Sequence, residues 1–111
     1  MTYDRELAER IRELVAGEPG LSEMRMFGGL AFLIGGNMAV AASGQGGLMV
    51  RVDPAESAVL VENTAAYPME MRGRPMPGWL RVDTEHVQTK KELSGWVKRG
   101  VSHARSLPAK K

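Results

Sequence analysis

Three glycine-rich breaks divide residues 22–53 into short apolar runs, and this pattern limits what the chain can fold into. The runs are 30–34, 38–42 and 48–53, and the breaks between and before them are Gly28-Gly29, Gly35-Gly36-Asn37 and Ser43-Gly44-Gln45-Gly46-Gly47. Each run is too short for a helix, and glycines supply the positive φ angles that tight hairpins need. The pattern therefore predicts a meander of three or four antiparallel strands.

Helical signals flank this segment on both sides. Near the amino terminus, apolar residues recur at helical spacing and end before Gly17; they are Leu7, Ile11, Leu14 and Val15. Thr2 or Asp4 is in position to cap this helix. After the meander, Asp53 and Pro54 have the residue types of an N-cap and a first helical position, and this second helix should end near Asn63.

The carboxy-terminal third contains a loop, a strand and the best-specified helix. Residues 64–78 hold three prolines and two glycines and are predicted to form a long loop, followed by a strand over 79–82. Thr89 and Glu92 have the spacing of a capping box, and Pro108 marks the end of the helix that they start. We expect an α+β fold: an antiparallel β-meander sheet flanked by amino-terminal and carboxy-terminal helices, with one domain over residues 1–108 and a disordered tail at 109–111.

Several function classes lack the residues that they need. The 111-residue chain has no cysteine, which excludes disulfides, thiolate nucleophiles and Cys-based zinc or iron–sulfur sites. His86 and His103 are 17 residues apart and show no metal-ligand spacing. The glycines at 44–47 precede a strand and not a helix, so they fit a hairpin better than a phosphate loop. We therefore expect no metal, no cofactor and no enzymatic activity.

No segment has the composition of a membrane helix or a signal peptide. The amino terminus is charged and periodic, and no apolar run approaches the roughly 20 residues that span a bilayer. The sequence therefore predicts a cytoplasmic protein without membrane contact.

Charge is distributed unevenly along the chain. Residues 1–80 carry seven Lys or Arg against ten Asp or Glu, whereas residues 81–111 carry eight against three. In the last helix, three basic side chains repeat every seven residues on the side opposite the apolar stripe, and a fourth lies to one side of them; the three are Lys91, Lys98 and Arg105, and the fourth is Arg99. Such a face attracts phosphates, but a solvated helix face is commonly charged and no aromatic residues interleave to stack on bases. Direct nucleic-acid binding is therefore an alternative hypothesis and not the favoured one.

The chain has eight methionines, and the seven that follow Met1 form two groups. Those at 24, 26, 38 and 49 lie on predicted strands and are expected to fill the core. Met69, Met71 and Met76 lie in the proline-rich segment, next to Arg72 and Arg74. Flexible thioethers beside arginines suit an adaptable contact surface, although the same segment could instead fold back over the sheet edge.

The chain resembles the amino-terminal domain of TfoX/Sxy-type competence regulators. The most specific stretch is Arg25-Met26-Phe27-Gly28-Gly29, and further matches are Gly36-Asn37-Met38, Leu48-Met49-Val50-Arg51-Val52, Pro68-Met69 and Gly78-Trp79-Leu80. The resemblance covers nearly the whole chain. It implies a curved antiparallel sheet flanked by helices, related in shape to secretion-chaperone-like folds that often dimerise. A basic residue at Arg51 is also frequent in the family.

What the resemblance implies about function is a role in regulation without catalysis. Full-length members act as transcriptional co-activators with a cyclic-AMP-responsive activator at competence promoters and carry a second, helical domain; we expect a stand-alone, single-domain member. The family supplies no catalytic residues. We expect a homodimeric, non-enzymatic protein-interaction module, with an unidentified protein partner contacted through Arg25, Arg51, Arg72 and Arg74. A small-molecule binder is a further alternative, and it requires an apolar pocket with convergent polar groups.

Overall fold

The glycine-punctuated segment forms four consecutive antiparallel strands in the computed structural model, which describes residues 3–26 and 28–108. These strands are β1 (Leu21–Met26), β2 (Gly29–Ile34), β3 (Asn37–Ala42) and β4 (Leu48–Arg51), each paired with the next. Gly35 and Gly36 have φ angles of 60° and 84°, the left-handed conformation that a two-residue hairpin turn requires. The predicted meander is confirmed, with four strands.

The prediction of a long loop over residues 64–78 is wrong. This segment contains β5 (Tyr67–Met71) and the first part of β6 (Arg74–Val82), which form an antiparallel hairpin. Its turn is Arg72-Gly73, with φ angles of 55° and 78°. Pro68 fits here because β5 is an edge strand, and Pro75 and Pro77 lie in the part of β6 that precedes its pairing with β4 at Trp79, so a missing N–H costs little at each position. The strand order is β1-β2-β3-β4-β6-β5, so β6 pairs with β4 and β5 lies at the outer edge.

The helices begin where their capping residues predict. Asp4 accepts hydrogen bonds from two backbone N–H groups at the start of α1 (Arg5–Val15), and Asp53 caps α2 (Pro54–Asn63). After β6 and a short 3₁₀ helix, η1 (Thr84–His86), Thr89 and Glu92 form both halves of the predicted capping box of α3 (Lys90–Ser106). Thr2, the other candidate cap of α1, lies outside the described residues.

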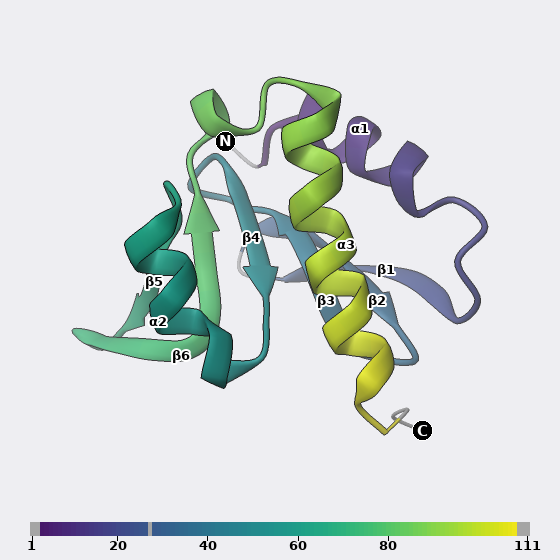
Figure 1. Cartoon of the computed structure of the whole chain (residues 1–111). Helices are drawn as coiled ribbons and strands as arrows, with labels where there is room; N and C mark the ends of the chain where they lie inside the picture. Colours follow the sequence, from purple (N-terminus) through teal and green to yellow (C-terminus); the bar gives the residue numbers. More distant parts are fainter. Residues whose placement is uncertain (1–2, 27, 109–111) are drawn as a thin grey trace.

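All three α-helices pack against the same face of the sheet (Figure 1). The core between these layers contains Leu7, Ile11, Phe32, Val40, Leu48, Val50, Leu80, Leu93 and Val97. Gly100 allows α3 to approach β3 closely, because a Cβ there would lie 2.9 Å from the carbonyl carbon of Ala39 and nearer still to its oxygen. The predicted α+β architecture, with helices on an antiparallel sheet, is confirmed.

The opposite face of the sheet carries no helix among the described residues. A second apolar cluster forms there: Ala31, Leu33, Met38, Ala41 and Met49 are buried, and Met26, Met69 and Trp79 pack against them. Met38 and Met49 thus fill a core, as predicted. Met24 does not, because 53% of its surface is exposed on β1.

Two further features of the sequence analysis concern residues that the structure does not describe. The tail predicted to be disordered, 109–111, and Phe27 of the Arg-Met-Phe-Gly-Gly stretch lie outside the described residues. Within the residues that are described, no helix combines the length and the apolar character needed to cross a membrane.

Candidate functional site

The helix-free face of the sheet carries two rows of side chains that the strand register places next to each other. Arg51 on β4 lies opposite Trp79 on β6, and in the neighbouring row Met49 lies opposite Arg81, which in turn lies opposite Tyr67 on β5. We call this surface the uncovered face, because no helix of the described residues lies over it. It is defined by the side chains that remain accessible over the buried second cluster: Met26, Arg51, Tyr67, Met69, Trp79 and Arg81.

Arg51 stacks on Trp79, with its guanidinium carbon 5.0 Å from the ring centroid. Both side chains are half-buried, which strengthens a cation–π contact relative to one in open water. In the part of the chain that the structure describes, no carboxylate lies within ion-pair distance of Arg51. A guanidinium that lies over an aromatic ring keeps its N–H donors for other acceptors, and no hydrogen bond from the Arg51 side chain is found in the described part of the chain.

Arg81 differs from Arg51, because its terminal N–H groups form hydrogen bonds within the fold, while its buried Nε has no hydrogen-bond partner among the described residues. The terminal N–H groups reach the side chains of Gln45 and Ser43 and the carbonyl oxygen of Gly46, the last at 3.3 Å. These bonds fasten the turn between β3 and β4. Its guanidinium also lies 5.9 Å from the centre of the Tyr67 ring. Arg81 therefore contributes positive charge to the uncovered face and holds the adjacent turn in place.

Tyr67 is anchored beside Arg81. Its hydroxyl group donates a hydrogen bond to Asp83 at 2.8 Å. Burial raises the pKa of Tyr67, and the hydrogen bond to Asp83 raises it further, so the phenol stays protonated and acts as a donor.

The structure spreads the four predicted partner-contact residues from one edge of the sheet to the other. Arg25 lies on the edge strand β1, on the helix-bearing side, because its register partner Leu30 belongs to the main core. Arg72 and Arg74 are exposed at the turn of the β5–β6 hairpin. Only Arg51 belongs to the uncovered face, so these arginines do not form one cluster.

Sequence reasoning missed Trp79, Arg81 and Tyr67. Trp79 and Arg81 alternate with the core residues Leu80 and Val82, and this period of two placed both on the face opposite the helices. This alternation is the sequence signal that could have placed Trp79 and Arg81 on that face. It could not identify Arg51 as the partner of Trp79, because that pairing depends on β6 returning to lie beside β4.

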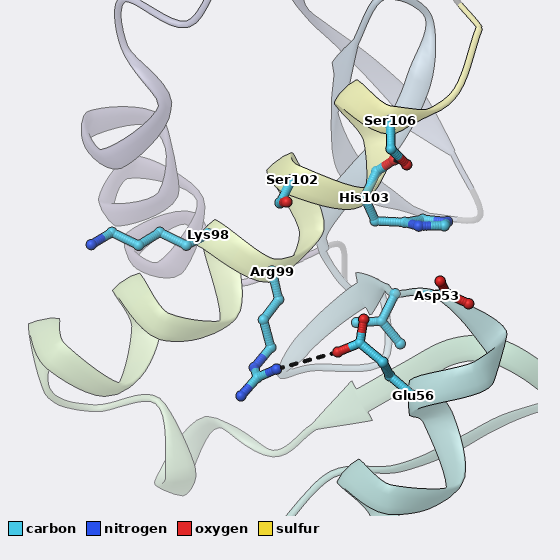
Figure 2. A pocket seen from close by; sticks show the side chains of 8 residues that line it. Asp53, Glu56, Lys98, Arg99, Ser102, His103 and Ser106 are labelled. Atoms are coloured by element: carbon cyan, nitrogen blue, oxygen red, sulfur yellow. Dashed lines mark hydrogen bonds and ion pairs between the residues drawn. The ribbon is translucent and has the colours of Figure 1, made fainter.

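A groove of about 450 Å³ lies on the other side of the molecule, between α2 and the carboxy-terminal half of α3. Figure 2 shows its lining, with Asp53, the cap of α2, and Glu56 in its first turn facing Arg99 and His103 from α3. Arg99 forms an ion pair with Glu56 at 3.7 Å and lies over the ring of Trp96. Asp53 is occupied as the cap of α2, accepting a hydrogen bond from the backbone N–H of Ala55 at 2.9 Å.

This groove contains serine, histidine and aspartate without the contacts of a catalytic set. Ser106 donates its hydroxyl hydrogen bond to the backbone carbonyl of His103 at 2.6 Å and not to the imidazole. Among the described residues no hydrogen bond joins His103 to Asp53 or to Ser102, so no serine is paired with a base. The lining is mostly charged and polar, whereas small-molecule sites are mostly apolar with a few convergent polar groups.

Ion pairs neutralise half of the basic face predicted on α3. Arg99 is paired with Glu56, and Arg105 is paired with Glu18 from the segment after α1. Lys91 and Lys98 are exposed, and Lys98 points away from both groove carboxylates in Figure 2. Direct nucleic-acid binding stays a prediction, and two of the four side chains that it needs already have carboxylate partners.

Metal binding has no geometric support in residues 3–26 and 28–108. No three His, Asp or Glu side chains are grouped there in a way that could hold a metal ion. His86 lies in η1 and His103 lies in α3, and the structure does not bring carboxylates together around either of them as a ligand set.

Comparison with known proteins identifies the family to which this fold belongs. A family model described as the TfoX N-terminal domain matches residues 13–104, from within α1 to within α3. No curated protein matches the chain significantly. The match includes every strand of the sheet and most of the 111 residues. The chain therefore belongs to the family of the TfoX N-terminal domain.

Proposed function

We propose that this chain is a non-enzymatic protein-interaction domain that binds an acidic, partly apolar peptide segment of a partner on the uncovered face. The observation that carries the proposal is the contact of Arg51 with Trp79: a half-buried guanidinium stacks on an aromatic ring and has no carboxylate partner in the described part of the chain. An arginine held in this way is preorganised to receive a carboxylate through two parallel N–H···O bonds.

The surroundings of Arg51 fit the apolar part of such a segment. Met26, Met69 and Trp79 pack over buried residues of the second cluster and remain partly accessible. Methionine side chains are flexible and polarisable, and they adjust to aliphatic or aromatic groups of differing shape. Arg81 adds a second positive charge to the same face. Together these features favour a partner that combines Asp or Glu with leucine, methionine or phenylalanine.

A role in transcription is the wider form of this proposal. Full-length proteins of the competence-regulator type work together with another protein at promoters, and docking of a partner segment is the activity that such a role requires. We therefore propose co-regulation by partner binding, in which the uncovered face supplies the contact and no chemistry is performed on the partner.

The test uses a display library of short random peptides selected on the purified protein. We expect the selected peptides to be enriched in Asp or Glu flanked by apolar residues. A synthetic peptide carrying that pattern is then titrated against the wild type and Arg51→Glu. Charge reversal should weaken binding by about tenfold or more, because the carboxylate then meets a like charge.

Lys98→Glu is the matched control. It makes the same change in net charge on the helix-bearing side of the molecule and should leave the peptide affinity unchanged. Circular dichroism and thermal unfolding establish that both variants are folded. Selection of peptides without acidic residues, or an equal loss of affinity in the two variants, would contradict the proposal.

A further inference from the structure

β1 is exposed on both of its faces, which distinguishes it from the three strands that follow it. The side chains of Ser22, Glu23, Met24 and Arg25 are all exposed, whereas every residue of β2 and β3 is buried. Met24 is 53% exposed although it is a large apolar residue. Because β1 is the first strand in the sheet order, its outer side pairs with no other strand of the described chain.

The free side of β1 carries the backbone groups of Glu23 and Arg25. The N–H of Gly35 bonds to the carbonyl of Gly20 at 3.0 Å, and residues 21–26 continue the same register with β2. Hydrogen-bonded and non-hydrogen-bonded pairs alternate along an antiparallel ladder. Gly20 and the even-numbered residues after it therefore direct their backbone groups toward β2, and Glu23 and Arg25 direct theirs outward.

We propose that a second copy of this chain pairs with β1, antiparallel and about a two-fold axis at Met24. In this register Glu23 of each copy lies opposite Arg25 of the other copy, so two opposite-charge pairs form. The outward backbone groups of the same residues complete the hydrogen-bonded ladder, and the two exposed Met24 side chains meet at the axis. Cross-strand pairs of opposite charge stabilise a sheet, and like charges placed opposite each other destabilise it.

The other two-fold registers that use the outward backbone groups are less favourable. Centring the pair on Glu23 places two carboxylates opposite each other, and centring it on Arg25 places two guanidinium groups opposite each other. Centring it on Ser22 leaves Glu23 opposite the apolar Leu21. The register centred on Met24 places a carboxylate opposite a guanidinium group on both sides of the axis. The alternation of Glu23, Met24 and Arg25 is therefore self-complementary.

Glu23 is held in place for this contact by α1. The guanidinium group of Arg12 binds both carboxylate oxygens of Glu23, each at 2.8 Å. These hydrogen bonds keep the carboxylate ionised and in one position at the sheet edge. A carboxylate has about four lone-pair sites, so it retains acceptor capacity for Arg25 of the second copy. Edge strands that only resist aggregation are blunted by charge, commonly lysine; β1 instead carries two opposite charges around an exposed apolar residue.

Disulfide trapping tests the register directly, because the natural chain has no cysteine. In the proposed pair the two residue-24 Cβ atoms are roughly 4.5–5.5 Å apart, close enough for a disulfide with slight adjustment. Met24→Cys should therefore yield a covalent dimer under mild oxidation on a non-reducing gel. Residue 22 lies on the same face of the same strand, but its two copies are roughly 13 Å apart along the ladder, so Ser22→Cys should not form the covalent dimer. Equal cross-linking of both variants, or of neither, would overturn the register.

Charge exchange tests the ion pairs, with molar mass measured by light scattering after size exclusion. The wild type is expected to be a dimer at micromolar concentration. Arg25→Glu and Glu23→Arg should each shift the protein to monomer, because every cross-strand pair then joins like charges. An equimolar mixture of the two variants should restore the dimer, since Glu23 meets Arg25 and the introduced Arg meets the introduced Glu. A monomeric wild type, or a mixture that stays monomeric while both variants are folded, would overturn the proposal.

Discussion

The two glycines of α3 lie five residues apart and differ in what surrounds them. A Cβ at Gly100 would press against the backbone of Ala39 and lie 2.9 Å from Cγ1 of Val40, whereas a Cβ at Gly95 would meet nothing within 4 Å. Gly100→Ala should therefore destabilise the fold by about 3 kcal/mol, since backbone cannot move aside as a flexible side chain does. Gly95→Ala should stabilise it by about 0.5–1 kcal/mol, because alanine restricts the unfolded chain and favours the helix. Urea unfolding of both variants measures the difference, and similar changes would contradict the packing argument.

At the same scale, Glu23 makes stability depend on pH. Hydrogen bonds from Arg12 hold the pKa of Glu23 below its usual value. A carboxyl whose pKa is lower in the folded state stabilises the fold above its unfolded pKa of about 4.3, and this contribution is lost as pH falls through the folded value. Glu23→Gln should lower the urea midpoint at pH 7, and the difference from wild type should shrink in acid. Submicromolar protein keeps self-association out of the comparison. A difference that is independent of pH would mean that the ion pair contributes nothing.

At the scale of elements, local signals predicted the helices and the meander well. Caps at Asp53 and Thr89 and the glycine-rich turns act over a few residues, so the sequence contains all that is needed to recognise them. The β5–β6 hairpin was missed because its prolines indicate a loop unless the strand is known to lie at an edge. Met24 was assigned to the core for a related reason: alternation does not reveal that β1 has no layer on either face.

The ion pairs of α3 bear directly on the hypothesis that its basic face binds nucleic acid. With Arg99 and Arg105 held by carboxylates, only Lys91 and Lys98 of the four are free to contact phosphates. Each phosphate contact contributes about −0.9 to the slope of log K against log salt, so we expect a slope near −2 for duplex DNA. Fluorescence anisotropy between about 50 and 200 mM salt measures it. A slope near −4 would mean that both arginines leave their carboxylates, and would favour nucleic-acid binding.

At the scale of the whole molecule, the two faces of the sheet differ in what packs against them. One face is closed by α1, α2 and α3 and supplies the main core. The other presents Arg51 on Trp79 among methionines, and no local pattern could have predicted that arrangement, because it requires β4, β5 and β6 to come together. The resemblance predicted the architecture that the structure shows, and the family match over residues 13–104 confirms the family. The candidate site could be recognised only from the register of the sheet.

The two edge strands of the sheet, β1 and β5, differ in whether another chain can pair with them. The proposed pairing through β1 uses the same surface on both copies. Such an interface is complete once two copies have joined. Each copy then presents β5 outward, and β5 contains Pro68, which has no N–H to offer an arriving strand. An added chain would find an incomplete ladder at either outer border of the joined sheet. In the proposed dimer, an exposed strand that would otherwise favour fibre formation joins only two molecules, and Pro68 at each outer edge opposes the addition of a third.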